Sequence, residues 1–338
     1  MKAISISEPF YMDIVSKREP KIGPEEVLLN IQYIGLCGSD LNIYRGTMPM
    51  ASYPRIPGHE ISATVIDKGD NVPKFEIGQQ VTLSPYSSCG VCPACRVGRT
   101  NTCEFNQTMG VQRDGALSEQ CAVHYSTLYS SEKLTLQEIA LTEPLSVGYH
   151  AANRAQVSET DTVLVLGCGT VGLGAIAASA RKGAGIIAAD IDDAKLDMAE
   201  NFGAQHVINT RQQDALEIIR DITGDDGVNA AIEAAGVPAT SQLAIEAVAF
   251  AGRVAFVGYS KEAVSFDTKL IVKKELTVSG SRNALFEFSD VLKMLEQHRF
   301  PFQKLITRVY PFEQTEQAFR DWNENPALFN KILIDLTK

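Results

Sequence analysis

The hydrophobic and polar positions follow one pattern before about residue 155 and another after it. In the first part, apolar and polar residues alternate over short segments at 3–6, 26–34, 60–67 and 77–83, with glycine and proline between them. Alternation with a period of two is typical of strands that bury one face. Several such strands with turn residues between them predict a small antiparallel, barrel-like β domain.

The second part begins with residues 162–166 (TVLVL), an apolar run of the kind expected in a parallel strand that is buried on both faces. Strands that alternate with helices predict a doubly wound parallel sheet. The further strands are expected at 185–190, 206–208, 228–234, 253–258 and 276–280, and the helices at 170–181, 215–222 and 239–250.

With 338 residues, the chain is long enough for two domains. We place the first at 1–152 and the doubly wound one at about 153–290. A helix is expected at 288–297, and we expect residues 291–338 to return to the first domain.

Composition and charge narrow the class of protein. The net charge of −10 argues against a nucleic-acid partner, which needs clustered lysine and arginine. The uncharged stretch 162–180 has the length of a membrane span, but its four glycines favour a buried strand, turn and helix, so no membrane partner is expected. Glu8 and Pro9 would interrupt a signal peptide. Without an export signal, the protein is expected to be cytoplasmic. In that reducing compartment, its seven cysteines indicate metal ligation rather than disulfides.

A glycine-rich motif, GCGTVG at 167–172, joins the first apolar strand to the following helix. This strand–motif–helix context is typical of a dinucleotide site. The first glycine permits a tight turn, the second lets the backbone approach the pyrophosphate, and the third allows the helix to pack closely on the strand. The phosphates would lie at the helix N-terminus, where free N–H groups and the dipole favour anions. The expected contacts are Gly167, Gly169, Thr170, Val171 and Gly172.

A carboxylate at the end of the second strand distinguishes NAD from NADP. Asp190 would accept hydrogen bonds from the adenosine ribose hydroxyls and would repel a 2′-phosphate. Asp192 and Asp193 add negative charge and supply no arginine. NAD is therefore expected. Lys195 is either a further ribose contact or an ordinary solvated helix lysine.

Four cysteines are clustered in a loop-like segment at about 86–105, namely Cys89, Cys92, Cys95 and Cys103. Four thiolates this close match a closed tetrahedral zinc site, which is structural because it leaves no open position. A disulfide pair is one alternative, which a reducing compartment disfavours. An iron–sulfur cluster is another, because it also uses four thiolates, and the spacing alone fits either metal.

Residues 37–60 combine a thiol, an imidazole and carboxylates. Cys37 and His59 lie on two separate expected loops, which suits a catalytic zinc with three protein ligands and one open position. The alternative is that Cys37 is a small buried hydrophobic residue and His59 an ordinary loop histidine. Each has polar neighbours that could take part: Ser39 and Asp40 follow the cysteine, and Glu60 follows the histidine.

Glu143 precedes Pro144 near the start of an expected helix at 140–152, where proline is tolerated in the first turn. Its carboxylate is either an anion favoured by the helix dipole or an inward-pointing ligand. His150 in the same helix is expected to be structural, and Cys121, in an expected strand at 115–125, is expected in the core.

The CGSD and GHE loops, the four clustered cysteines, the EPLSVG segment and the GxGxxG motif together resemble the zinc-containing medium-chain dehydrogenases over essentially the whole chain. Ser39, in place of threonine or arginine, and Glu143, where alcohol dehydrogenases carry cysteine, resemble the sorbitol and sugar-acid branch. GRTNTC at 98–103 and GSRNA at 280–284 resemble segments of L-galactonate and L-gulonate 5-dehydrogenases and of related starvation-sensing proteins. The resemblance implies a GroES-like β-barrel catalytic domain, a Rossmann domain, and a homodimer or tetramer.

The resemblance also implies roles for individual residues. Cys37 and His59 would bind the catalytic zinc, with Glu60 and Glu143 competing for the third protein position. The four clustered cysteines would hold a second, structural zinc. Asp40 resembles the acid that orients the zinc histidine.

Ser39 resembles the hydroxyl that takes the proton of the substrate alcohol. Alcohol dehydrogenases pass that proton outward through a histidine three residues further on. This position is Asn42 here, which cannot titrate, so the route of the proton to solvent is open.

The expected reaction is a reversible, NAD-dependent oxidation of a secondary hydroxyl on a small polyhydroxylated substrate. Zinc would lower the pKa of the hydroxyl toward ~7, and NAD would accept the hydride. A sugar acid such as L-gulonate is the favoured substrate and a neutral polyol is the alternative. An alternative of another class is a noncatalytic NAD-binding zinc protein with a regulatory role.

A sugar-acid carboxylate requires a cation in the pocket, ideally one that can form a bidentate pair. An arginine in such a position is more often solvated or structural, and Arg282 could instead contact NAD. Tyr44 and Tyr53 could line the pocket or simply pack in the core. The candidate arginines are Arg45, Arg55, Arg113 and Arg282.

Overall fold

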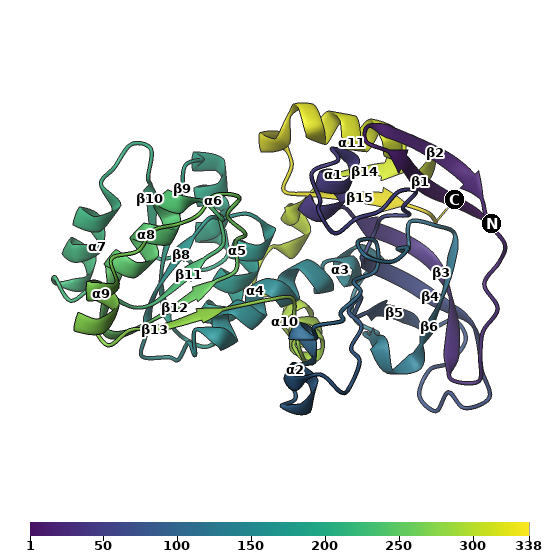
Figure 1. The fold of residues 1–338 in the computed structure, drawn as a ribbon, viewed down its shortest axis with the longest axis horizontal. Helices are drawn as coiled ribbons and strands as arrows, with labels where there is room; N and C mark the ends of the chain where they lie inside the picture. Colours follow the sequence, from purple (N-terminus) through teal and green to yellow (C-terminus); the bar gives the residue numbers. More distant parts are fainter. Residues whose placement is uncertain (338) are drawn as a thin grey trace. The chain divides into compact units, whose positions relative to one another are not determined.

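The computed structural model describes residues 1–337, which divide into two compact units. Unit 1 comprises Met1–Glu143, Phe288–Gln297 and the residues from Phe302 onward. Unit 2 comprises Pro144–Glu287 and His298–Pro301. Residues at the two ends of the chain therefore share one unit (Figure 1).

Unit 1 is built on a seven-stranded sheet in which β14, β15, β3, β4, β5 and β7 follow one another and β6 also pairs with β3. All neighbours are antiparallel except β14 and β15. A separate hairpin joins β1 and β2. The strands are β1 (Lys2–Glu8), β2 (Tyr11–Ser16), β3 (Glu26–Gly35), β4 (Glu60–Lys68), β5 (Gln80–Leu83), β6 (Gln120–His124), β7 (Leu128–Ser130), β14 (Ile306–Pro311) and β15 (Lys331–Asp335). The helices are α1 (Gly38–Tyr44), α2 (Pro93–Arg96), α3 (Leu136–Ala140), α10 (Phe288–Glu296) and α11 (Thr315–Glu324), with short 3-10 turns η1 (Thr100–Thr102), η2 (Tyr125–Thr127), η3 (Phe302–Leu305), η4 (Phe312–Gln314) and η5 (Pro326–Leu328).

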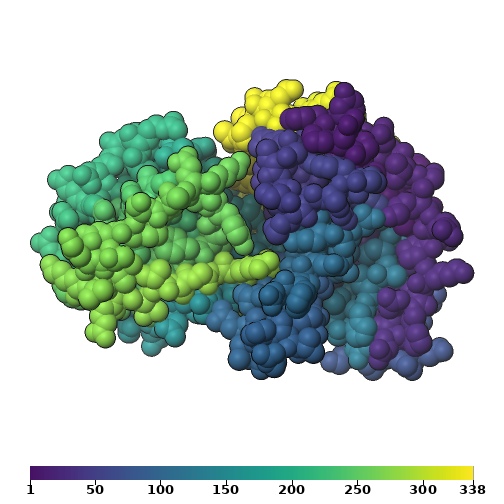
Figure 2. Space-filling view, in the orientation of Figure 1, coloured from purple at the N-terminus to yellow at the C-terminus, as the bar shows by residue number. Residues whose placement is uncertain are grey.

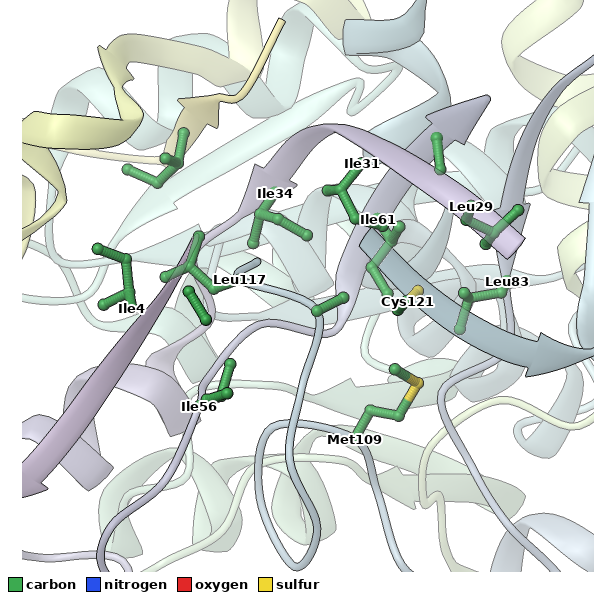
Figure 3. Packing of buried hydrophobic residues seen from close by; sticks show 14 of the residues in the cluster. Ile4, Leu29, Ile31, Ile34, Ile56, Ile61, Leu83, Met109, Leu117 and Cys121 are labelled. Atoms are coloured by element: carbon green, nitrogen blue, oxygen red, sulfur yellow. The ribbon is translucent and has the colours of Figure 1, made fainter. Parts of the chain in front are cut away.

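The core of unit 1 forms because apolar residues alternate along its strands. On β3, Leu29 and Ile31 have no exposed surface, and Ile61 on β4 packs in the same cluster (Figure 3). Cys121 lies in this core, as predicted. The burial of apolar side chains on one face of the sheet is the main favourable term that holds the loops between the strands in place.

The C-terminal segment completes the sheet of unit 1. β15 pairs antiparallel with β3, where Leu333 lies opposite Gly35. In Figure 2 the yellow C-terminal residues lie against purple residues from the N-terminus, and α11 contacts α1. The sequence predicted only mixed structure for this segment, and it did not predict α1, α3 or α11.

Unit 2 is a six-stranded parallel sheet in the order β10-β9-β8-β11-β12-β13, with helices on both sides (Figure 1). This order, counted from β8, is the doubly wound one. The strands are β8 (Thr162–Leu166), β9 (Gly185–Asp190), β10 (His206–Asn209), β11 (Val228–Glu233), β12 (Val248–Phe256) and β13 (Thr277–Gly280). The helices are α4 (Thr142–Arg154), α5 (Thr170–Arg181), α6 (Asp193–Asn201), α7 (Ala215–Thr223), α8 (Pro238–Ala247) and α9 (Thr268–Lys273). No helix within residues 1–337 is long and apolar enough to cross a membrane.

The expected helix at 239–250 was wrong at its end. α8 stops at Ala247, and β12 begins at Val248. Val248 pairs with Val228 of β11, and the pairing resumes only at Arg253 after an irregularity. The sheet contact of a buried β-branched residue therefore outweighs the local helical pattern.

Candidate active site and zinc centres

Three of the predicted catalytic-zinc ligands lie together in unit 1. Cys37 caps the N-terminus of α1, His59 directly precedes β4, and Glu60 is the first residue of β4. The two loops meet because Gly35 at the end of β3 pairs with Glu60. The candidate ligand atoms of the three residues all lie within 4.8 Å of one another. A thiol, an imidazole and a carboxylate at this separation are a donor set that zinc accepts.

Asp40 joins the two loops. Its Oδ2 accepts a hydrogen bond from the Cys37 backbone N–H at 2.9 Å, and its Oδ1 accepts one from the Gly58 N–H at 3.1 Å. The carboxylate has no exposed surface. Its Oδ1 lies 3.8 Å from His59 Nδ1, which is too long for a hydrogen bond. Asp40 therefore fixes the backbone on both sides of the site and acts on the imidazole through its charge.

The electrostatics of the site fit a bound cation. Burial lowers the pKa of His59, but the negative charges of Asp40, Cys37 and Glu143 outweigh it and raise that pKa well above its ordinary value. Within the described chain, the buried Oγ of Ser39 and Nδ1 of His59 have no hydrogen-bond partner. Buried polar atoms are seldom left unsatisfied. A cluster of anions with orphaned polar atoms beside it is the arrangement expected around a metal and its substrate.

Glu143 lies at the start of α4 and is 4% exposed. One of its carboxylate oxygens accepts a hydrogen bond from the hydroxyl of Tyr86. Burial raises the pKa of Glu143, an effect that the charge of His59 opposes. The coupling of its charge to His59 and Glu60 puts Glu143 beside the ligand group formed by Cys37, His59 and Glu60, although it is not a member of that group. Tyr86 was not predicted, because nothing in its loop sequence marks it.

Glu60 has a partner that the sequence reasoning missed. Lys331, the first residue of β15, is 4% exposed, and its Nζ lies 2.6 Å from both carboxylate oxygens of Glu60. Burial lowers the pKa of Lys331, but the charges of Glu60 and Cys37 outweigh this and raise it. A signal was available, since residues 331–335 (KILID) place a lysine at the head of an apolar strand. Buried lysines are rare unless they are paired.

The four clustered cysteines form a separate centre. Their sulfur atoms all lie within 4.8 Å of one another, and Cys92 Sγ is 3.9 Å from Cys103 Sγ. Four Zn–S bonds of ~2.3 Å at tetrahedral angles separate the sulfurs by about 3.8 Å, whereas a disulfide requires ~2.05 Å. The geometry therefore fits one ion. An iron–sulfur cluster, with several irons between the thiolates, would hold some of the sulfurs further apart.

Backbone N–H groups prepare this centre for thiolates. The N–H of Cys89 donates to Cys103 Sγ at 3.3 Å, and the N–H of Cys92 donates to Cys89 Sγ at 3.3 Å. Backbone hydrogen bonds, with that from Glu104 the strongest, lower the pKa of the Cys92 thiol to about 6. Burial raises the pKa of Cys95 to about 12. A bound cation would remove this difference between the pKa values of the Cys92 and Cys95 thiols, because a thiol that coordinates a metal is deprotonated.

In unit 2, the glycine motif lies between β8 and α5, as predicted. Gly167 has a φ of +92°, and Gly169 caps the N-terminus of α5. Asp190 at the end of β9 accepts hydrogen bonds from the N–H groups of Cys168 and Ile191, each at 2.7 Å. Its carboxylate is thus held at the same edge of the sheet as the motif. In doubly wound sheets, dinucleotides bind in the crevice outside the carboxyl ends of the parallel strands, and this edge of the sheet is that end.

The remaining predicted residues of unit 2 differ in their exposure to solvent. Thr170 and Val171 form the first turn of α5 and are partly exposed, as are Lys195 on α6 and Arg282 after β13. His150 Nδ1 lies 2.7 Å from Glu287 Oε1, and both residues are buried, so His150 is structural as expected.

The candidate substrate residues are distinguished by their partners. Arg55 is 8% exposed and pairs with Asp114 at 3.4 Å, so its charge is already compensated. Arg45 also has neutral acceptors, namely Oδ1 and the backbone carbonyl oxygen of Asn323, and it differs from Arg113 in being half-buried. Arg113 is exposed and donates to the carbonyl oxygens of Gln107 and Pro85, neither of which carries a charge. Tyr44 packs between Phe10 and Phe319, and the Tyr53 hydroxyl donates to the Ile43 carbonyl, so both tyrosines are structural.

Each of the two units contains a segment that matches a known protein family. The alcohol dehydrogenase GroES-like domain matches residues 23–133, and the zinc-binding dehydrogenase domain matches residues 170–297. The chain belongs to the zinc-binding alcohol dehydrogenase family. This confirms the predicted fold class, a GroES-like antiparallel β domain with a Rossmann sheet.

Individual relatives of this zinc-binding dehydrogenase span nearly its whole length. Sorbitol dehydrogenase of Bacillus subtilis is 35% identical over 325 residues, covering 94% of this chain and 92% of the relative. L-galactonate-5-dehydrogenase of Escherichia coli is 31% identical over 335 residues, covering 98% of each. A solved alcohol dehydrogenase from E. coli CFT073, complexed with NADH, is 29% identical and covers 99% of each chain with a TM-score of 0.92.

The zinc-binding dehydrogenase is an NAD-dependent enzyme of the alcohol, polyol and sugar-acid class, and zinc and NAD are its cofactors. The predicted enzyme class and cofactors are confirmed. The noncatalytic alternative is set aside.

Proposed function

We propose that the enzyme oxidises a secondary hydroxyl of a sugar acid of the L-gulonate type to a keto-hexonate. The observation that carries this proposal is Arg113, an exposed arginine whose hydrogen-bond acceptors are neutral carbonyl oxygens. One of these belongs to Pro85, the residue before Tyr86, whose hydroxyl binds Glu143. The guanidinium thus keeps its charge for a carboxylate, which it can bind with two parallel hydrogen bonds. The similarity to L-galactonate-5-dehydrogenase supports the same class of substrate.

The proposed catalytic zinc is held by Cys37 and His59 and by a carboxylate, from Glu60 or Glu143, in unit 1. A zinc ion there would act as a Lewis acid that makes the substrate hydroxyl more acidic. Asp40 keeps the two loops together through its hydrogen bonds to Cys37 and Gly58. Cys89, Cys92, Cys95 and Cys103 are proposed to hold the structural zinc.

Ser39 is proposed to accept the proton of the substrate hydroxyl, because its Oγ is buried in the site without a partner in the described chain. The next step outward is not a histidine, since Asn42 occupies that place and its Oδ1 accepts a hydrogen bond from Thr47 Oγ at 3.3 Å. The proton is therefore expected to leave through hydroxyls and water rather than through a titrating side chain.

Unit 2 is proposed to bind NAD through its glycine motif, with Asp190 on the adenosine ribose and Lys195 and Arg282 as further contacts. NAD is the hydride acceptor.

We expect the enzyme to be cytoplasmic and homo-oligomeric. Its oligomeric state is tested by size-exclusion chromatography with light scattering. A monomer at all concentrations would contradict it.

A panel of aldonates and neutral polyols, each offered with NAD and with NADP, tests the substrate. We expect NAD reduction with L-gulonate or a related hexonate. Arg113→Gln should raise KM for the hexonate by about 10-fold or more, the loss of one charge-assisted pair, with little effect on a polyol. Arg45→Gln is the matched control. Activity confined to uncharged polyols would contradict the sugar-acid proposal and would support the polyol alternative.

The catalytic site has its own test. Cys37→Ala should abolish turnover and leave NAD binding intact, because the thiol belongs to unit 1 and the dinucleotide motif to unit 2. Undiminished activity in this variant would contradict the proposed chemistry.

A further inference from the structure

The chain that follows β13 is anchored by a buried carboxylate, that of Glu287, which is 6% exposed. Its Oε1 lies 2.7 Å from Nδ1 of His150 and accepts a hydrogen bond from Asn153 Nδ2 at 3.1 Å. Its Oε2 accepts hydrogen bonds from the backbone N–H groups of Leu285 and Phe286, at 2.6 and 3.0 Å. Glu287 therefore closes a turn on its own segment and fastens that turn to helix α4.

Helix α4 also holds the beginning of this segment. Arg154 donates from Nε to the carbonyl oxygen of Gly280, the last residue of β13, at 3.0 Å. Residues 281–286, between the two anchors, form neither helix nor strand. Asn283 among them has a φ of +55°, a left-handed conformation that persists only where the surrounding structure fixes it. One helix thus fixes both ends of a segment that has no regular structure of its own.

The same helix is joined to α5, which carries the glycine motif at its N-terminus. A Cβ at Gly148 of α4 would lie 2.1 Å from the carbonyl oxygen of Val171, so the two helices are in direct backbone contact. At the other end of α5, Nζ of Lys182 donates to Oδ1 of Asn153 at 2.8 Å, which leaves Nδ2 of that amide for Glu287. Helix α4 therefore ties the position of residues 281–286 to that of the glycine motif.

The segment begins at the edge of the sheet where a dinucleotide would lie. The last residues of four neighbouring strands lie in register there, namely Leu166, Glu233, Phe256 and Gly280. In doubly wound sheets a dinucleotide binds outside these carboxyl ends, across the point where the strand order reverses, with one nucleotide on each side. That point lies between β8 and β11. Because Asp190 on β9 is proposed to bind the adenosine ribose, the nicotinamide half belongs on the side of β11, β12 and β13.

The first residue of the segment carries a polar group that lacks a partner. Ser281 is 6% exposed, and its backbone N–H donates to the carbonyl oxygen of Phe256 at 2.8 Å. Its hydroxyl is buried and has no hydrogen-bond partner within residues 1–337. Buried hydroxyls are seldom left unsatisfied, so this one is the kind of group that a bound coenzyme satisfies.

We propose that Glu287 and His150 are positioning residues, which hold residues 281–286 where they contact the nicotinamide half of NAD. The inference rests on the proposed binding of NAD by unit 2, with the adenosine ribose at Asp190. Without the anchor, the segment is free to leave its left-handed turn. Contacts to the nicotinamide half are then lost, whereas those to the adenosine half remain.

The test compares the binding of NADH with that of ADP-ribose, which lacks the nicotinamide ring, by calorimetry on the full-length enzyme. In Glu287→Met, the Kd for NADH should rise by about 10-fold, which corresponds to the loss of one hydrogen bond to the coenzyme. The Kd for ADP-ribose should change by less than about 2-fold, because its own contacts are kept.

Asp161→Leu is the matched control for a general loss of stability. Asp161 is 7% exposed and pairs with Arg253, as Glu287 pairs with His150, but it precedes β8 and so lies at the amino ends of the strands. This variant should be less stable than wild type and should keep the wild-type ratio of the two Kd values. If Glu287→Met does not fold, Asn153→Leu, at an exposed position of α4, removes one hydrogen bond of Glu287. It should raise the Kd for NADH by about 2- to 5-fold and leave that for ADP-ribose unchanged.

Asp190→Ala distinguishes a failure of this inference from a failure of the proposed NAD site, because it should weaken the binding of NADH and ADP-ribose alike. If it does so while Glu287→Met or Asn153→Leu keeps the wild-type ratio of the two Kd values, the positioning role is wrong and the NAD site stands. An equal shift of the ratio in Asp161→Leu would also overturn the inference. If Asp190→Ala binds both ligands as tightly as wild type, the proposed NAD site fails and the inference fails with it.

Discussion

Two glycines of the dinucleotide motif should respond in opposite ways to the same substitution. A Cβ at Gly172 would lie 1.8 Å from the carbonyl oxygen of Gly167, and real Cβ contacts are essentially never under 3.0 Å. The backbone would have to open by 1.2 Å, the difference between 3.0 and 1.8 Å. A Cβ at Gly169 would meet nothing within 4 Å, and its φ of −71° suits any residue.

Gly172→Ala should therefore destabilise the enzyme without NAD, and Gly169→Ala should not. Overpacking of this kind costs about 1–3 kcal/mol, which lowers Tm by about 2–12 °C for a unit of this size. Gly169→Ala should leave Tm unchanged or slightly raised, because alanine restricts the unfolded chain. Its methyl group would instead occupy the space where the backbone approaches the pyrophosphate. Losing one such charge-assisted hydrogen bond, about 1.5–3 kcal/mol, weakens NAD binding by about 10- to 150-fold.

The assay is thermal unfolding by circular dichroism without NAD, together with NAD titration by calorimetry on both variants. The reasoning fails if Gly169→Ala binds NAD as tightly as wild type. It also fails if Gly172→Ala unfolds at the wild-type temperature.

Three further predictions concern other sites. The pKa of Glu287 is lowered from 4.5 to about 2 by its bonds to His150 and to backbone N–H groups, despite burial. Its contribution to stability, about 3 kcal/mol, should thus be present above pH 4.5 and lost as the pH falls toward 2. Chemical denaturation of Glu287→Gln should therefore show a stability that depends less steeply on pH over that window. Cys95→Ser should lower the zinc content by one ion per chain, measured by atomic absorption, because three thiolates cannot close the tetrahedron. Asp190→Ala should reduce the NAD-to-NADP ratio of kcat/KM by at least about 10-fold, because a charge that repels the 2′-phosphate is removed.

Each of these has a control and a contrary result. Glu262→Gln, at an exposed position, should keep the wild-type pH dependence, and an equally steep profile in Glu287→Gln would contradict the first prediction. Cys121→Ser, in the core, should retain all zinc, whereas unchanged zinc in Cys95→Ser would contradict the second. Asp197→Asn, exposed on α6, should keep the wild-type coenzyme ratio, and the same ratio in Asp190→Ala would contradict the third.

The features that the sequence determined by itself are those carried by residues close together in the chain. The strand at residues 162–166, the glycine motif and the helix to residue 181 occupy one continuous segment, and their predicted bounds match β8 and α5. The four clustered cysteines likewise need only a short loop to bring their sulfurs together. Local periodicity and local spacing suffice in such cases, because few conformations satisfy the burial pattern of the segment.

The tertiary structure decided what depends on the pairing of distant strands. Lys331 meets Glu60 across 271 positions of sequence, because β15 returns to pair with β3 beside β4. Tyr86, in the loop after β5, reaches Glu143 in the first turn of α4 across 57 positions. The register of strand pairing is set by how whole faces of the sheet bury their side chains and not by any short stretch of sequence. The sequence therefore identified the candidate metal donors, and the fold determined which charges surround them.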